Sequence, residues 1–405
     1  MPERIGLDLR HDMARITPGH AVAGVSPSRS RRGATMTARP ARPARPGQPA
    51  GLLDTIEFQR FGCVQNGSHL YGDVLDAVHR DVSGAGPCAD VLRPHAAAPF
   101  ADAIVLRFLG GVHRLVLEGR APELAEHYPS AGGEPHPGVG PAFVATVAAH
   151  QVTLARRMHD GVQTNEVGRS ASLLGGFLAA ATIGGGLPLR ILEVGASAGL
   201  NLRFDGYRYE SGLDSFGPAD SPLRFVDPWA AGGSTPLPGS CTVLERRGCD
   251  IAPIDPTTAD GRLTLRSYVW PDQSARFERL DSALEVAGLV PAPVDRAEAG
   301  PWLRARLADP VPGVVTVVVH SIMFQYLSRL QQRELLEVTE EAGQCSSPDA
   351  PFAWLRMEPG GEHAEIRLTT WPGRATRLLA TSTYHGPPVR WVDEHVARRE
   401  SAGAA

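Results

Sequence analysis

The feature that most constrains the fold is a short apolar run, LPLRILEV, that leads directly into a glycine loop, GASAG. Such a run between turn-forming residues is typical of a strand buried on both faces of a parallel sheet. Gly195 and Gly199 follow at once and let the main chain turn tightly. We therefore predict an α/β fold in which this loop lies at the end of the sheet where ligands bind.

The chain before this run predicts helices only. From Leu52 to about Ala180, apolar residues recur at intervals of three and four, which is the spacing of a helix face. The segments with this spacing are LLDTIEFQRF, HLYGDVLDAVHRDV, FADAIVLRFLGGVHRLVLEG and PAFVATVAAHQVTLARRMHD. LPLRILEV is therefore predicted to be the first strand of its sheet.

After the loop, strand and helix patterns alternate. The strand candidates are CTVLERR, PAPVDR, GVVTVVVHS and PFAWLRMEP, separated by the helical segments SARFERLDSALEVAG, PWLRARLAD and LSRLQQRELLEVTEEAG. This alternation predicts βαβ units and a parallel sheet. AEIRLTTWPGRATRLLATSTYH predicts an antiparallel hairpin on the sheet's edge, and the insertion YRYESGLDSFGPADSPLRFVDPW predicts a small β-excursion.

The length of 405 residues predicts more than one folded part. We expect an Arg/Pro/Ala-rich leader without packed structure at 1–50, a helical domain at 51–170, a Rossmann-like domain at 171–395 and a disordered tail at 396–405.

Composition excludes several functions. The formal net charge of −4 argues against nucleic-acid binding, which requires an excess of basic side chains. The five cysteines form no CxxC pair, so we expect neither a disulfide framework nor a metal site. No apolar run approaches the ~20 residues of a membrane-spanning helix, and no signal peptide is evident. We expect a cytoplasmic protein without a membrane partner, and the oligomeric state stays open.

The loop has two interpretations. Gly195-x-Ser197-x-Gly199 fits the nucleophile elbow of a serine hydrolase, and the addition of Glu193 fits the S-adenosylmethionine loop of a methyltransferase. An elbow stands on a sheet begun by several earlier strands, whereas this loop follows the first. The cofactor loop is therefore favoured, while the histidines His320, His363 and His385 keep a hydrolase based on Ser197 open.

Beyond the loop, the segment from about Ser172 to Trp391 resembles class I S-adenosylmethionine-dependent methyltransferases, with Glu193, Gly195 and Gly199 as the first motif. The span from about Ile56 to Trp391 is similar to a bacterial family of unknown function. The strings that carry this similarity are TNEVGRSASLL, LEVGASAGLNL, ERRGCDIAPIDP, SYVWPDQ, VVVHSIMFQYL, FAWLRMEP and LATSTYHG.

The resemblance implies a methyltransferase-type Rossmann sheet and S-adenosylmethionine as cofactor. The implied cofactor-binding residues are Glu193, Gly195, Ser197, Gly199 and Asn201, with Glu245 or Asp250 at the ribose and Asp295 or Glu298 near the adenine. The amides of the helix after the loop would meet the methionine carboxylate.

Substrate-facing groups are expected at the same edge of the sheet. GVVTVVVHS ends on His320 and Ser321, and His320 could act as a base if the methyl acceptor must lose a proton. QTNEVGR supplies Asn165, Glu166 and Arg169 as candidate substrate-binding residues. The sequence thus predicts methylation of a small molecule between the two domains, with a non-catalytic ligand-binding protein and a serine hydrolase as alternatives.

Overall fold

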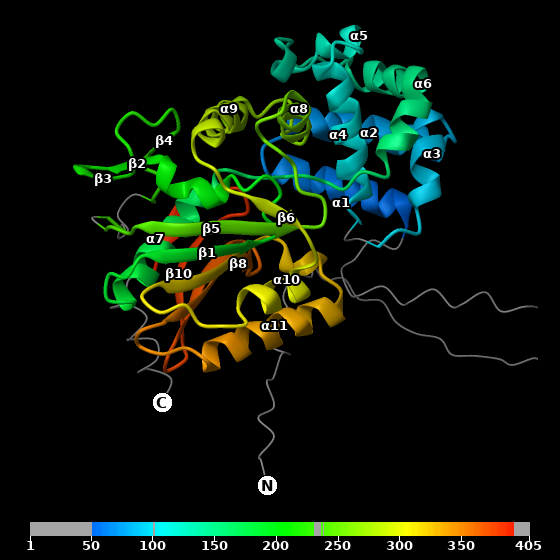
Figure 1. Ribbon diagram of the computed structural model, residues 1–405. Helices are drawn as coiled ribbons and strands as arrows, with labels where there is room; N and C mark the ends of the chain where they lie inside the picture. The colour runs from blue at the N-terminus through cyan, green and yellow to red at the C-terminus, as the bar shows by residue number, and fades with distance from the viewer. Residues whose placement is uncertain (1–50, 100–101, 231–235, 238, 393–405) are drawn as a thin grey trace, which may run out of the picture.

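The computed structural model describes residues 51–99, 102–230, 236–237 and 239–392, which form a helical body beside a central sheet (Figure 1). The predicted leader at 1–50 and tail at 396–405 lie outside the described residues. The predicted α/β class is confirmed.

The chain begins with helices. They are α1 (Leu52–Gln65), α2 (His69–Ser83), α3 (Pro87–Leu92), α4 (Ile104–Leu117), α5 (Pro122–Ala125), α6 (Val139–Arg157) and α7 (Arg169–Ile183), with short 3-10 turns at Arg93–His95 and Pro129–Ala131. The first six pack around a core of their own that includes Ile56, Val74 and Phe108. Within the described residues, no strand precedes Leu189.

The main sheet has eight strands in the order β11-β10-β9-β8-β7-β1-β5-β6. They are β1 (Leu189–Val194), β5 (Val243–Asp250), β6 (Val294–Arg296), β7 (Val315–Ser321), β8 (Phe352–Pro359), β9 (Ala364–Trp371), β10 (Ala375–Thr383) and β11 (Gly386–Trp391). β6, β5, β1, β7 and β8 are mutually parallel, and β9 to β11 are antiparallel. Every predicted strand is present, and β1 is buried along its whole length, as its apolar sequence requires.

Both faces of the sheet are covered. The remaining helices are α8 (Ala259–Ser267), α9 (Ser274–Leu289), α10 (Ala299–Arg306) and α11 (Arg329–Gln344), with 3-10 turns η4 (Asn201–Gly206) and η5 (Phe324–Tyr326). α7 and α9 share a core with one face, to which Ile191 and Val317 point. α10 and α11 cover the other face, where Leu192 and Val318 lie (Figure 1).

The predicted β-excursion is a separate three-stranded sheet. Its strands are β2 (Arg208–Ser211), β3 (Asp214–Phe216) and β4 (Arg224–Val226), in the order β3-β2-β4.

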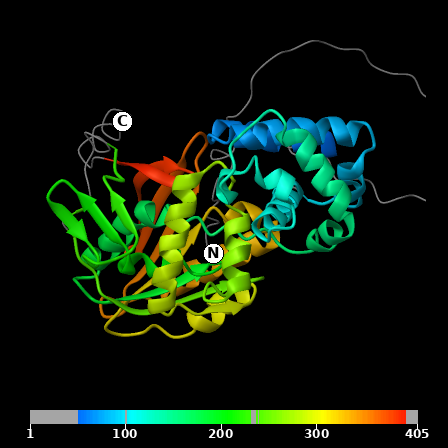
Figure 2. The same ribbon diagram turned by 90° about the horizontal axis from the view of Figure 1, so that it is seen from above.

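α8 and α9 lie between the sheet and the helical body (Figure 2). His113 of α4 is fully buried there, between the carbonyl oxygen of Ser267 and the hydroxyl of Ser130, and burial lowers its pKa to about 3. Arg114 forms an ion pair with Asp260 of α8. A neutral buried histidine and this ion pair therefore join the two bodies.

Two predictions about local structure are wrong. The hairpin of β9 and β10 is not at the sheet's edge, because GPPVRW forms β11 and pairs outside β10. Its prolines, Pro387 and Pro388, fall at a register shift between the pairs Thr383–Gly386 and Thr381–Arg390, and such an irregularity tolerates residues without an N–H. The glycine loop leads into the 3-10 turn η4 rather than an α-helix. Arg203 has non-helical angles, and its guanidinium donates to the carbonyls of Ala198 and Gly199.

Candidate functional site

The candidate site lies at the carboxyl ends of β1 and β7. β5 and β6 extend the parallel sheet on one side of β1, and β7 and β8 extend it on the other, so the strand order reverses between β1 and β7. In open α/β sheets, ligands bind at such a reversal. Gly195 follows β1, and a Cβ placed on it would lie 3.1 Å from the Cβ of Met323, which follows β7. The two loops therefore meet over the edge of the sheet.

Backbone conformation explains the glycines of the loop. Gly195 and Gly199 have φ of +69° and +67°, where a side chain would be strained. Ser197 also has a positive φ, +51°. Strain at a residue other than glycine persists only where surrounding contacts enforce it, and it is common at functional sites.

Asp250 fixes the loop to β5. Its Oδ2 accepts a hydrogen bond from the amide of Ser197 at 3.0 Å, and its Oδ1 accepts one from the amide of Ala252 at 2.9 Å. The amides of Gly195 and Ala196 donate to the carbonyl oxygen of Cys249. The predicted ribose acid thus lies at the carboxyl end of β5 and holds the loop in its strained shape.

Residues 161–168, which we call the strap, cross the loop. The hydroxyl of Ser197 donates to Oε1 of Gln163 at 2.6 Å. Oδ1 of Asn165 accepts from the amides of Ala198 and Leu200, at 3.2 and 2.9 Å. These amides precede η4, where the sequence predicted contacts with a methionine carboxylate. In this structure, both amides donate to the side-chain oxygen of Asn165.

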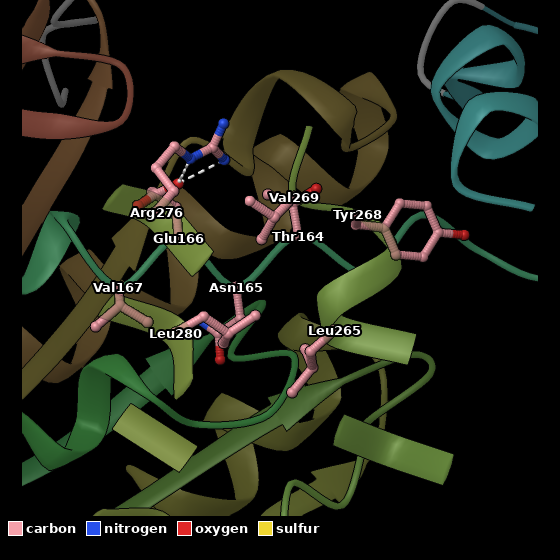
Figure 3. Close-up of a pocket in the computed structure, with 9 residues that line it drawn as sticks. All are labelled: Thr164, Asn165, Glu166, Val167, Leu265, Tyr268, Val269, Arg276 and Leu280. Carbon is pink, nitrogen blue, oxygen red and sulfur yellow. Dashed lines mark hydrogen bonds and ion pairs between the residues drawn. The ribbon is translucent and has the colours of Figure 1, made fainter. Parts of the chain in front are cut away.

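Glu166 and Arg169 anchor the strap. Glu166 pairs with Arg276 of α9 at 2.6 Å (Figure 3). Burial by itself would raise the pKa of Glu166, but Arg276 and neighbouring cationic groups outweigh burial and hold it at about 2. Arg169 is buried and donates to the carbonyl oxygens of Tyr384 and Ser321, both at 3.1 Å. The start of α7 is thereby fixed to the ends of β7 and β10.

Glu193 is the loop-motif residue with unmet hydrogen-bonding capacity. It is 2% exposed, and its Oε2 has no hydrogen-bond partner among the described residues. Burial raises its pKa to about 8, although Arg169 opposes the shift. The carboxyl is therefore mostly protonated at pH 7. Because side chains alternate along a strand, it lies on the α7 face with Ile191.

His320 lies at the end of β7, on the face covered by α11. It is 1% exposed, and its Nδ1 lies 2.7 Å from Oε1 of Glu358, the penultimate residue of β8. No described residue hydrogen-bonds its Nε2. Glu358 was not among the predicted site residues. The signal was present, because an acid ends the strand predicted from PFAWLRMEP, and β8 pairs with β7.

The other predicted cofactor-binding residues differ in position and in their hydrogen bonds. Glu298 is exposed at the carboxyl end of β6 and makes no capping hydrogen bond, and Asn201 is buried and accepts from the hydroxyl of Ser170. Asp295 is bonded to Arg247 and Trp302, and Glu245 pairs with Arg190 near the amino end of β5. Asp250 is the last residue of β5 and Glu298 follows β6, whereas Asp295 lies within β6 and Glu245 lies near the start of β5.

Three features are absent among the described residues. The hydroxyl of Ser197 donates to Gln163, and among the described residues no histidine is hydrogen-bonded to it. In the part of the chain that the structure describes, no cluster of three metal-binding side chains occurs. Over the same residues, no helix is long and apolar enough to span a membrane.

A small pocket lies beside the strap. Figure 3 shows the residues that line it, among them Asn165, Glu166, Leu265, Tyr268 and Arg276. Its free space is about that of one water molecule. With the strap in this position, a nucleoside does not fit into it.

Fold and site together define a mixed α/β protein with a helical body and a glycine loop at the reversal point of its sheet. The chain belongs to the bacterial family DUF2332, described as an uncharacterized protein conserved in bacteria, which matches residues 55–391. The expected similarity to a bacterial family of unknown function is thereby confirmed. No curated protein and no solved structure matches the chain.

Proposed function

We propose that this protein is an S-adenosylmethionine-dependent methyltransferase that acts on a small molecule between the helical body and a Rossmann-like domain of methyltransferase type. The observation that carries the proposal is the position of Glu193, Gly195 and Gly199 at the point where the strand order reverses. That is where a doubly wound sheet binds a nucleotide cofactor.

The residues present fit the cofactor once the strap moves. Oε2 of the buried Glu193 lacks a hydrogen-bond partner among the described residues and would accept a hydrogen bond from the ammonium group of the methionine part. The amides of Ala198 and Leu200 would exchange Asn165 for the ligand's carboxylate. Glu298, exposed at the end of β6, would contact the adenosine. When bound, the cofactor supplies an electrophilic methyl group, and the protein's task is alignment and exclusion of water.

Movement of the strap is the conformational step that this function requires. The strap holds the loop with one serine–glutamine bond and two bonds to Asn165. Each such bond contributes a net stabilisation of about 1 kcal/mol, which a ligand carboxylate with its own charge-assisted bonds could replace.

Isothermal titration calorimetry with S-adenosylhomocysteine tests the proposal. Because Glu193 is mostly protonated at pH 7, capture of an ammonium group by its carboxylate should release close to one proton per ligand. The apparent enthalpy should therefore differ between phosphate and Tris buffers. The difference should vanish in Glu193→Gln. Absence of heat from the wild-type protein at millimolar ligand would remove the proposal.

A ligand-binding protein without turnover is the second candidate function, and the strap over the loop favours it. Its signature would be binding of S-adenosylhomocysteine without transfer of a labelled methyl group to any metabolite. The positive φ of Ser197 is the observation that favours a serine hydrolase. Labelling of Ser197 by a fluorophosphonate probe would support that activity.

A further inference from the structure

The hydrogen bonds around Glu358 determine where the proton of His320 resides. Oε1 of Glu358 accepts from the amides of Met323 and Phe324, at 3.1 and 3.3 Å, and it also lies 2.7 Å from Nδ1 of His320. An oxygen that already accepts from two amides faces the imidazole as an acceptor. The hydrogen between the two side chains therefore belongs to Nδ1 of His320.

With the proton on Nδ1, the lone pair of a neutral imidazole is on Nε2. That nitrogen is buried and lacks a hydrogen-bond partner among the described residues, as does Oε2 of Glu358. Leaving buried polar atoms unmatched costs about 1–3 kcal/mol each, so a native protein rarely keeps two of them together without a purpose. Both atoms accept hydrogen bonds. A ligand that satisfies them must bring O–H or N–H groups.

The same carboxylate fixes the loop that covers this pair. The ring of Phe324 stacks on His320 at 6.0 Å between centroids, and Met323 is the residue that reaches Gly195. Ile322, at the start of this loop, has a φ of +49°, a strained angle for a β-branched residue. Glu358 thus holds the histidine and the loop that meets the glycine loop in one arrangement.

We propose that His320 is the general base of the site, with Nε2 as the basic nitrogen and Glu358 as its positioning residue. The substrate is then a hydroxyl- or amine-bearing small molecule whose attacking atom carries a proton. This inference rests on the proposed methyltransferase function. As the bond between the acceptor oxygen or nitrogen and the methyl carbon forms, the sulfur–methyl bond breaks, and sulfur keeps the electron pair. The acceptor's proton passes to Nε2, and the carboxylate of Glu358 stabilises the resulting imidazolium.

The proton assignment is tested by 15N NMR of the histidine rings at pH 8. The His320 signals are identified as those missing from His320→Asn, a variant whose amide can still donate to Glu358. The wild type should show a protonated Nδ1 and an unprotonated Nε2. Glu358→Gln keeps an acceptor oxygen and should keep this tautomer, whereas Glu358→Met should lose it. A proton on Nε2 in the wild type overturns the proposal, and so does an unchanged tautomer in Glu358→Met.

The base role is tested with [methyl-3H]S-adenosylmethionine and a bacterial metabolite fraction. The wild type should form an O- or N-methylated product, and His320→Asn should lose at least 100-fold in rate while still binding S-adenosylhomocysteine. An undiminished rate in His320→Asn overturns the base. Failure of the wild type to form such a product, although it binds S-adenosylhomocysteine, counts against the substrate class. Failure of the wild type to bind S-adenosylhomocysteine removes the methyltransferase, while the NMR result still decides the tautomer.

Discussion

Replacing Glu193 by glutamine keeps the shape of the side chain but removes its titration. In the folded protein, burial raises the pKa of Glu193 from 4.5 to about 8. The unfolded chain therefore loses this proton near pH 4.5, while the native protein keeps it up to about pH 8. The native state binds more protons in that window, so its free energy of unfolding must fall as pH rises. This contribution is fully present below pH 4.5 and is lost above pH 8.

The size of the effect follows from the shift. At 1.36 kcal/mol per unit, a displacement from 4.5 to about 8 corresponds to about 5 kcal/mol, of which about 3 kcal/mol falls between pH 5 and pH 8. Since whole domains are stable by only 5–15 kcal/mol, this is a large fraction of the total. Glu193→Gln should lack this pH-dependent contribution to the free energy of unfolding. Wild type and variant should therefore converge or cross in stability as pH rises.

Urea unfolding at pH 5, 6, 7 and 8, followed by tryptophan fluorescence, measures the difference. Trp302, Trp354 and Trp371 lie in the core between the sheet and α11, so the signal reports on the sheet. Glu298→Gln, a change at an exposed acid, is the matched control and should follow the wild type. Parallel curves for wild type and Glu193→Gln would show that the carboxyl is not desolvated, and they would refute the argument.

Four further predictions concern the loop and the strap. Gly195→Ala and Gly119→Ala both place a side chain at a positive φ, near +70°, and each should cost about 1–2 kcal/mol of stability. A Cβ at Gly119 meets open space, so only Gly195→Ala should weaken binding of S-adenosylhomocysteine, as measured by calorimetry. Equal affinities of the two variants would contradict the proposed ligand position beside Gly195. Arg276→Met leaves the carboxylate of Glu166 buried without its main partner, so the free energy of unfolding in urea should fall by about 3 kcal/mol. The control Arg60→Met, which removes an exposed ion pair, should lower it by less than about 1 kcal/mol. Because the pKa of Glu166 is lowered to about 2, the stabilisation from its ionised carboxylate is present above pH 4.5 and is lost as pH falls toward 2. Glu166→Gln should therefore shift the midpoint of acid unfolding, and a midpoint equal to that of the wild type would contradict this. Asn165→Ala removes the acceptor from two loop amides, so thermal unfolding should occur earlier, while affinity for S-adenosylhomocysteine should rise up to about tenfold. A loss of affinity would show that Asn165 binds the ligand instead of competing with it.

Local patterns were sufficient to predict the strands. LPLRILEV and GVVTVVVHS are mostly apolar on both faces because β1 and β7 are buried along their whole length. Their alternation with helices was sufficient to place β1 first. The edge strand β11 escaped prediction because GPPVRW holds two prolines, which normally argue against a strand, and its place depends on pairing with β10.

The sequence identified candidate site residues but not the contacts between them. Asn165 and Ser197 were both selected from sequence, yet the bonds of the strap join residues more than thirty positions apart, and no local pattern encodes such a pairing. Likewise, the tautomer of His320 depends on Glu358, which approaches it through the pairing of β7 with β8. Burial of Glu193 beneath α7 is also a tertiary property. Its pKa therefore could not be predicted from the motif.

The central claim is that a nucleoside cofactor binds where β1 and β7 diverge. A crystal structure of the protein grown with S-adenosylhomocysteine measures this most directly. We predict ligand density beside Gly195, with its ammonium group within hydrogen-bonding distance of Glu193 and with Asn165 displaced from the amides of Ala198 and Leu200. Ligand bound elsewhere, or a loop with its bonds to Asn165 intact at saturating ligand, would contradict the account.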